Sequence, residues 1–156
     1  MIGIFSGDIF SLEADLIAVT VNTVGAMGKG IALTARERWP SVNRRYRAIC
    51  LSSGGKDLAF ERFPVIINPD EEPSKGALLI ATKRDWRDGA RLEDVVVQIG
   101  KTVNLIERRF ADGPSATIAL PPLGCGLGGI DWAVVRPLMA SAFAPSRHNY
   151  LMPDAA

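Results

Sequence analysis

Short apolar runs alternate along this chain with segments of helical periodicity, and this alternation restricts the possible folds more than any other feature. The runs have strand length, several are apolar throughout, and they cover residues 2–5, 16–22, 76–83, 115–120 and 149–152. A strand that is apolar on both faces has to be covered on both sides. We therefore predict a sheet that lies between two layers of helices.

The clearest helical pattern covers residues 91–110, where apolar side chains recur every three or four positions until a turn at 112–114. A second pattern predicts a helix at 31–39, which has to stop before Pro40. Ser41 is then a candidate cap for a further helix.

Two more stretches have weaker patterns. Asp131 is a candidate cap for a last helix, in which Pro137 is tolerated only in or near the first turn. The stretch between the second helix and the central apolar run predicts a strand at 58–63 and a loop around 68–76.

Length and composition predict one domain over residues 1–156 and exclude several classes of protein. The chain is 47% hydrophobic and 22% charged, and its net charge of +1 gives no overall attraction to nucleic acid or membrane. Cys50 and Cys125 are far apart, and His148 is the only histidine, so we expect no metal, disulfide framework or bound cofactor. No long unbroken apolar run is present, which favours a cytoplasmic protein without membrane attachment.

Two glycine-rich loops, 25–30 and 124–129, each follow an apolar run and precede a helix. A helix that begins at a glycine turn offers free N–H groups and the positive end of its dipole, which suits a phosphate. If the two preceding strands are neighbours, both loops lie at one sheet edge and bind a diphosphate from two sides. The alternative is that the glycines only form tight turns.

Known nucleotide motifs do not explain these loops. A P-loop requires glycine six residues before its lysine and Ser or Thr after it, whereas Thr23 and Gly30 occupy these positions around Lys29. The dinucleotide fingerprint matches 124–129, but too late in the chain for a ribose-binding acid to follow at the usual distance.

Four segments together resemble the macrodomain family, whose members bind ADP-ribose. They are GDIF at 7–10, VNTVGAMGKGIAL at 21–33, TKRDW at 82–86 and LPPLGCGLGGIDW at 120–132. The resemblance covers nearly the whole chain and implies a three-layer α/β/α fold with a central mixed sheet of about six strands. Within the family the chain is most similar to antitoxin macrodomains of the DarG type.

That similarity implies an ADP-ribosyl glycohydrolase that removes ADP-ribose from thymidine bases of single-stranded DNA, with a DarT-like toxin as a possible partner. Two alternatives remain: a hydrolase of ADP-ribosylated aspartate or glutamate on proteins, and a non-catalytic ADP-ribose-binding module.

The resemblance also implies roles for residues of the pocket. Asp8 would accept a hydrogen bond from the adenine amino group beside the Ile9 backbone, and Asn22 would hold the distal ribose. The diphosphate would lie between two sets of loop residues: Gly28, Lys29, Gly30 and Ile31 on one side, and Leu123, Gly124, Cys125, Gly126 and Leu127 on the other. Other interpretations are a turn residue for Asp8, a strand-end cap for Asn22 and a surface charge for Lys29.

Lys83 is implied as the catalytic residue, because TKRDW matches the lysine motif of the hydrolases that act on DNA and on carboxylates. An amine attacks the anomeric carbon only when neutral, which needs desolvation or a nearby cation such as Arg84. A charged Lys83 could instead protonate the departing base. Taken alone, a lysine at a strand end is usually a solvated charge.

Gly128 departs from the pattern of the carboxylate-directed relatives, which carry an aspartate at this position to partner the lysine. We interpret Asp131 as a helix cap and not as a replacement. The glycine therefore favours the branch that acts on DNA.

Trp86 stands among cations, including Arg84 and Arg87, in a composition that can stack an unpaired base and follow a nucleic-acid backbone. The alternative is that Trp86 packs inward. Cys125 has no base nearby in sequence, so we interpret it as a small loop residue and not as a nucleophile.

Overall fold

The protein is described by a computed structural model that covers residues 1–155. Six strands form one sheet in the order β1-β6-β5-β2-β4-β3. Neighbouring strands are parallel except β3, which pairs antiparallel with β4, so the sheet is mixed as expected. The strands are β1 (Ile2–Phe5), β2 (Leu16–Val21), β3 (Val65–Ile67), β4 (Gly76–Ala81), β5 (Thr117–Ala119) and β6 (Asn149–Pro153).

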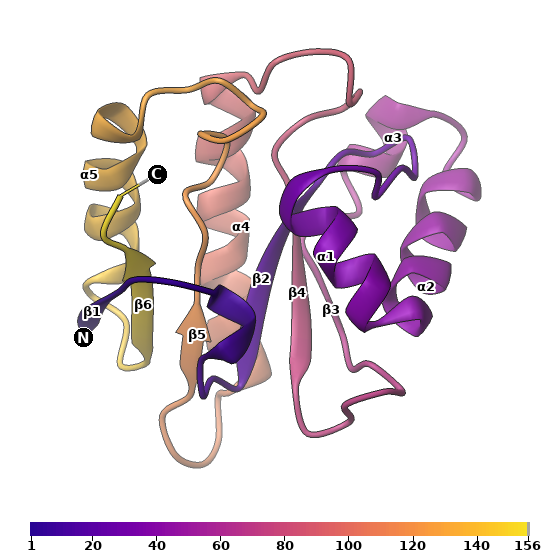
Figure 1. The fold of residues 1–156 in the computed structure, drawn as a ribbon. Helices are drawn as coiled ribbons and strands as arrows, with labels where there is room; N and C mark the ends of the chain where they lie inside the picture. The colour runs from indigo at the N-terminus through magenta and orange to yellow at the C-terminus, as the bar shows by residue number, and fades with distance from the viewer. Residues whose placement is uncertain (156) are drawn as a thin grey trace.

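Helices cover both faces of this sheet, which confirms the three-layer α/β/α prediction (Figure 1). Helices α1 and α2 pack on one face, with α3 beside them, and α4 and α5 pack on the other. Their bounds are α1 (Gly30–Arg38), α2 (Pro40–Leu51), α3 (Lys56–Phe60), α4 (Leu92–Arg109) and α5 (Trp132–Phe143), and a short 3-10 helix η1 (Ile9–Ser11) follows β1.

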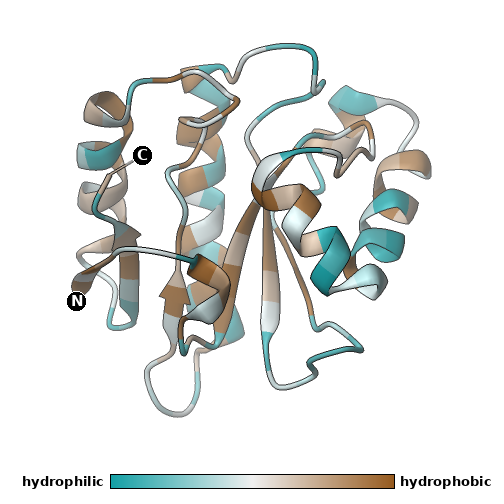
Figure 2. Cartoon of the chain, viewed as in Figure 1, coloured by the Kyte–Doolittle hydropathy of each residue, from teal (hydrophilic) through white to brown (hydrophobic). Residues whose placement is uncertain are grey.

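The central strands alternate between two hydrophobic cores. In β2, Ile17 and Val19 belong to the core under α1 and α2, whereas Leu16 and Ala18 belong to the core under α4 and α5. Because side chains alternate along a strand, a strand that is apolar at every position has to be covered twice. Figure 2 shows the hydrophobic colour gathered on the strands, with hydrophilic residues on the outer surface of α2 and in the loops.

The strand predicted at 58–63 is wrong. The chain forms helix α3 there, and β3 begins only at Val65. Ala59, Phe60 and Phe63 are buried while Leu58 is exposed, so the apolar side chains follow helical and not alternating spacing.

Two predicted details of helix ends are also wrong. Helix α2 begins at Pro40, whose fixed φ suits a first turn, and Trp39 is its cap residue. The Ser41 hydroxyl instead donates to a carboxylate oxygen of Glu71 (2.6 Å). In α5 the Asp131 carboxylate caps the helix as predicted, accepting from a backbone N–H of the first turn, but Pro137 lies inside the helix and past that turn.

Candidate functional site: a cavity at the carboxyl ends of the parallel strands

One large cavity, of about 1220 Å³, opens where the parallel strands end. Ligands bind at this edge of parallel α/β sheets, and small-molecule sites usually measure about 300–1000 Å³. The loops that follow β2 and β5 both border the cavity, because these two strands are neighbours. The predicted meeting of the two glycine loops at one sheet edge is therefore confirmed.

The first loop leads into helix α1 and lines the cavity with Gly28, Lys29, Gly30 and Ile31. Gly30 has φ +58°, a left-handed conformation that side chains disfavour. In the described part of the chain no side chain caps α1, whose first N–H groups therefore stay free at the cavity wall. These groups and the helix dipole make this edge suitable for an anion.

The second loop, 124–129, is held in shape by its own backbone. The N–H groups of Gly129 and Ile130 donate to the carbonyls of Gly126 (3.2 Å) and Gly124 (3.0 Å). Within residues 1–155, the N–H groups of positions 126, 127 and 128 have no acceptor, and all three residues line the cavity. Three consecutive free donors make this loop, like the first, suitable for an anion.

Gly128 lies in the tightest part of this loop. A Cβ atom there would come within 2.4 Å of the Gly124 carbonyl oxygen and 2.9 Å of the Ala90 Cβ. A side chain, including the aspartate of the carboxylate-directed relatives, does not fit this backbone. At Gly28 and Gly126, by contrast, a Cβ would meet only the open space of the cavity.

Asp8 and Asn22 both line the cavity and both also stabilise their own loops. The Asp8 carboxylate accepts from the Phe10 N–H (3.0 Å) as the cap of η1. The Asn22 amide donates to the Ala26 carbonyl (2.8 Å), and its oxygen accepts from the Tyr46 hydroxyl (2.8 Å). Asp8 is thus a turn residue and Asn22 holds the loop after its strand, as the alternative interpretations stated. Both residues nevertheless line the cavity.

Lys83 is the second residue after β4 and reaches the cavity half-buried. Its Nζ donates to the Trp86 carbonyl (3.3 Å), which fixes the amine against the turn that follows. Lys83 also borders a second, smaller cleft on its other side. Lys83 therefore lines two depressions.

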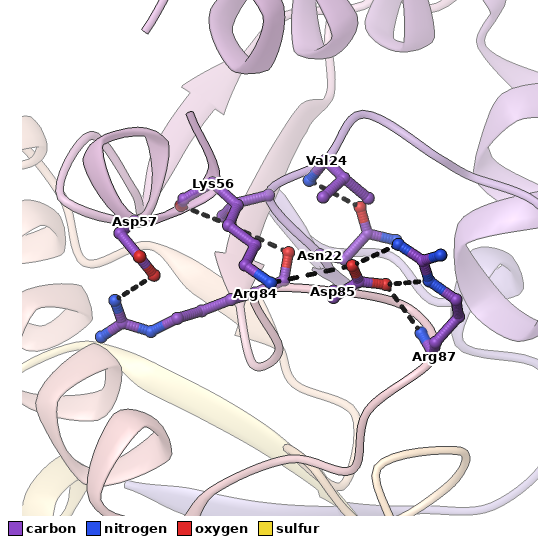
Figure 3. A network of polar contacts seen from close by, with 8 residues as sticks. Asn22, Val24, Lys56, Asp57, Arg84, Asp85 and Arg87 are labelled. Carbon is purple, nitrogen blue, oxygen red and sulfur yellow. Dashed lines mark hydrogen bonds and ion pairs between the residues drawn. The ribbon is translucent and has the colours of Figure 1, made fainter. Parts of the chain in front are cut away.

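Arg84 points away from the cavity. Its guanidinium donates to Asp57 (2.9 Å) and Asp94 (3.2 Å) and lies 4.3 Å from the centre of the Phe60 ring (Figure 3 shows the Asp57 contact). These hydrogen bonds, first that to Asp94, raise the pKa of Arg84. The charge of Arg84 is therefore offset by carboxylates outside the large cavity.

The turn after Arg84 is held by Asp85, which is buried. Its carboxylate accepts from the Arg87 guanidinium (2.8 Å) and backbone N–H (3.0 Å), and the Lys56 ammonium lies 3.8 Å away on the other side (Figure 3). The Arg87 contacts hold the pKa of Asp85 well below its usual range. Trp86 is 52% exposed at the cavity mouth, with the Arg87 guanidinium 5.6 Å from its ring centre.

Most of the predicted site residues meet at this cavity, but three do not. Leu123 is fully buried beneath the second loop, and Arg84 faces the smaller cleft. The Cys125 Sγ points back to the Leu123 carbonyl (3.5 Å). Burial, and next the charge of Asp131, raise the pKa of the Cys125 thiol, which disfavours the thiolate that a nucleophile needs.

Sequence reasoning missed several cavity residues at the ends of strands or directly after them. They are Phe5 at the end of β1, Thr82 after β4, Pro121 and Pro122 after β5, and Pro153 at the end of β6. The apolar runs of the sequence could have indicated these residues, because each residue stands at or near the end of one run. The carboxyl ends of parallel strands share one edge of the sheet, where ligands bind.

Among residues 1–155, no helix has the length and hydropathy to cross a bilayer. The same residues contain no group of three or more His, Cys, Asp or Glu side chains that could hold a metal ion.

Comparisons with known proteins agree with this architecture. No protein-family model matches the chain. The DNA ADP-ribosyl glycohydrolase of Mycobacterium tuberculosis is 31% identical over 143 residues, which is 92% of this chain and 39% of that protein. The chain thus spans about two fifths of the length of that curated relative.

Solved structures give the same result. The macrodomain of Mycobacterium tuberculosis DarG superimposes with a TM-score of 0.83 at 27% identity, covering 100% of this chain and 99% of that one. The structure of Thermosipho africanus DarTG in complex with ADP-ribose has a TM-score of 0.82 at 26% identity and covers 97% of this chain and 41% of that one. The chain belongs to the macrodomain family, in which it is similar to the macrodomains of DarG.

Proposed function

We propose that this protein is an ADP-ribosyl glycohydrolase that releases ADP-ribose from thymidine bases of single-stranded DNA. The observation that carries the proposal is the pair of glycine loops, whose free N–H groups face one cavity with Lys83 in its wall. A diphosphate bound between the loops directs one sugar toward Lys83. The Mycobacterium tuberculosis relative is named a DNA ADP-ribosyl glycohydrolase, which supports DNA as the class of substrate.

The reaction cleaves the bond between the anomeric carbon of the ribose and a nitrogen of the base. Water supplies the hydroxyl that the sugar gains and the proton that the base takes. Lys83 acts at this bond as a neutral nucleophile or as an acid that protonates the departing base. Asp8 and Asn22 bind the adenine and the distal ribose, and Trp86 with Arg87 contacts the nucleic acid at the cavity mouth. The DarTG neighbour supports a DarT-like toxin as partner.

A hydrolase of ADP-ribosylated carboxylates is the second candidate, and the second loop disfavours it. The aspartate that partners the lysine in those relatives has no counterpart at Gly128, and the backbone leaves no room for one. A simple ADP-ribose-binding module is the third candidate.

Two labelled substrates separate the three candidates. The protein is incubated with an oligonucleotide that carries ADP-ribose on one thymidine and, separately, with a protein that carries it on glutamate. We expect release from the oligonucleotide and far slower release from the protein. Preferential release from the protein would contradict the proposal, as would binding of free ADP-ribose with no release from either substrate.

A further inference from the structure

The small cleft on the far side of Lys83 is a second feature of the same wall. It measures about 340 Å³, and its charged lining residues are Lys56, Asp57, Lys83, Arg84, Asp88, Arg91 and Asp94. Among residues 1–155, Lys83 alone borders both this cleft and the large cavity. The small cleft is therefore next to the residue at which the proposed acceptor is joined to ADP-ribose.

The wall between the two depressions is tied to the loops of the site. The Thr23 hydroxyl donates to the Lys56 carbonyl (2.8 Å), and its backbone N–H donates to the Arg84 carbonyl (3.2 Å). On the other side, the Ala90 N–H donates to the Gly128 carbonyl (2.9 Å). The cleft thus has a fixed position relative to both glycine loops, with Lys56 and Arg91 on the segments so held.

The charges of the cleft are unevenly paired. Asp57 and Asp94 both accept from Arg84, whose single positive charge offsets only one of their two negative charges. Lys56 is exposed, and its ammonium lies 3.8 Å from the Asp85 carboxylate. This contact is longer than the 2.8 Å contact between Arg87 and the same carboxylate. The guanidinium of Arg91 has no hydrogen bond or ion pair with any other part of residues 1–155 and is exposed. With Asp88 and Lys83 counted, the lining holds four cationic side chains and three carboxylates, an excess of one positive charge, and Lys56 and Arg91 are the exposed cations among them.

We infer that this cleft holds a backbone phosphate of the nucleic-acid strand next to the modified nucleotide, through Lys56 and Arg91. The inference rests on the proposed function. Cations at such a groove contact phosphates independently of the base sequence and make binding salt-dependent. Lys56 and Arg91 are then specificity-determining residues that separate a polynucleotide substrate from a single ADP-ribosylated nucleoside.

The test compares two substrates in the wild type and in the double variant Lys56→Ala/Arg91→Ala. One substrate is ADP-ribosylated thymidine without flanking phosphates, and the other is the same nucleoside within a single-stranded nonamer. We expect kcat/KM on the nonamer to fall about five- to tenfold at low salt, and kcat/KM on the nucleoside to stay unchanged. Arg108→Ala, at the far end of α4, is the matched control for an exposed arginine.

A second measurement uses an unmodified, fluorescein-labelled (dT)9 strand, and does not depend on catalysis. Binding of this strand should weaken in the double variant, and the slope of log affinity against log salt should drop by about 0.7 for each phosphate that the variant no longer binds. Equally reduced turnover of both substrates, or unchanged binding of the strand, would overturn the inference. Wild-type protein that hydrolyses neither substrate but binds the strand through these residues would instead refute the proposed function alone.

Discussion

At the scale of single residues, the site depends on backbone that tolerates no side chain at one position and leaves open space at another. Gly128 packs against the Gly124 carbonyl, whereas Gly126 faces the cavity. Both are glycines of the same loop, so the sequence alone does not distinguish them, and both have free N–H groups in the structure. Their different surroundings give opposite expectations for stability.

Gly128→Ala should lower the free energy of unfolding by about 1–3 kcal/mol, since backbone has to move to admit the methyl group. Gly126→Ala should change it by less than about 0.5 kcal/mol and instead weaken ADP-ribose binding, because its methyl group enters the cavity. Urea unfolding and calorimetry on both variants measure the two effects. Equal stability of the two variants would show that the loop is not packed as described.

At the scale of elements, helix α5 begins directly after the second glycine loop. The Asp131 carboxylate accepts from the Ala133 N–H (3.0 Å) and satisfies one of the free donors of the first turn. This is a structural contact, and Asp131 is not among the residues that line the large cavity.

Asp131→Ala should therefore lower the free energy of unfolding by about 1 kcal/mol and leave ADP-ribose release close to that of the wild type. Asp131→Asn, which retains a capping oxygen, is the control and should cost less. The prediction fails if Asp131→Ala abolishes release while the protein stays folded, because Asp131 would then act in the chemistry.

Elements with strong patterns were predicted from the sequence, and those set by tertiary contacts were not. Helix α4 follows from its periodicity, and β2 and β4 follow from apolar runs of strand length. The segment 56–67 did not, since its five-residue helix and three-residue edge strand are too short for a pattern to distinguish. Ser41 was expected to cap a helix, but the acidic side chain of Glu71, thirty residues away, binds it instead.

The same difference applies to the candidate site. The glycine loops and Lys83 stand at the ends of recognisable strands, so their meeting could be predicted once the strands were taken as neighbours. The direction of a side chain could not, because it depends on partners from distant segments. Arg84 turns toward Asp57 and Asp94, and nothing in TKRDW indicates that the large cavity loses this cation.

At the scale of the whole molecule, the only histidine, His148, makes the stability of the fold depend on pH. His148 is fully buried beside β5 and β6, and its Nδ1 accepts from the Ala116 N–H (2.9 Å), so the ring is neutral in the fold. Burial, and next the charge of Arg147, lower the pKa of His148. The unfolded chain, with an ordinary histidine pKa of about 6.5, therefore binds more protons than the folded chain near pH 6.

The resulting contribution to stability is complete above pH ~6.5 and is lost as the pH falls below it toward the folded pKa. In His148→Asn an amide oxygen can still accept from Ala116 but does not titrate. The wild type should thus lose more stability than this variant between about pH 7.5 and 5, measured by urea midpoints. Parallel pH profiles for the two proteins would contradict this assignment.

The central claim is that paired glycine loops hold ADP-ribose so that its distal sugar meets Lys83. Release of ADP-ribose from the modified thymidine oligonucleotide by Lys83→Ala, measured alongside calorimetric binding of free ADP-ribose, tests it most directly. We predict that release falls about 10²- to 10⁴-fold while affinity changes little, and that the surface control Lys101→Ala releases normally. Wild-type release by Lys83→Ala, or no heat when ADP-ribose is added to the wild type, would contradict the account.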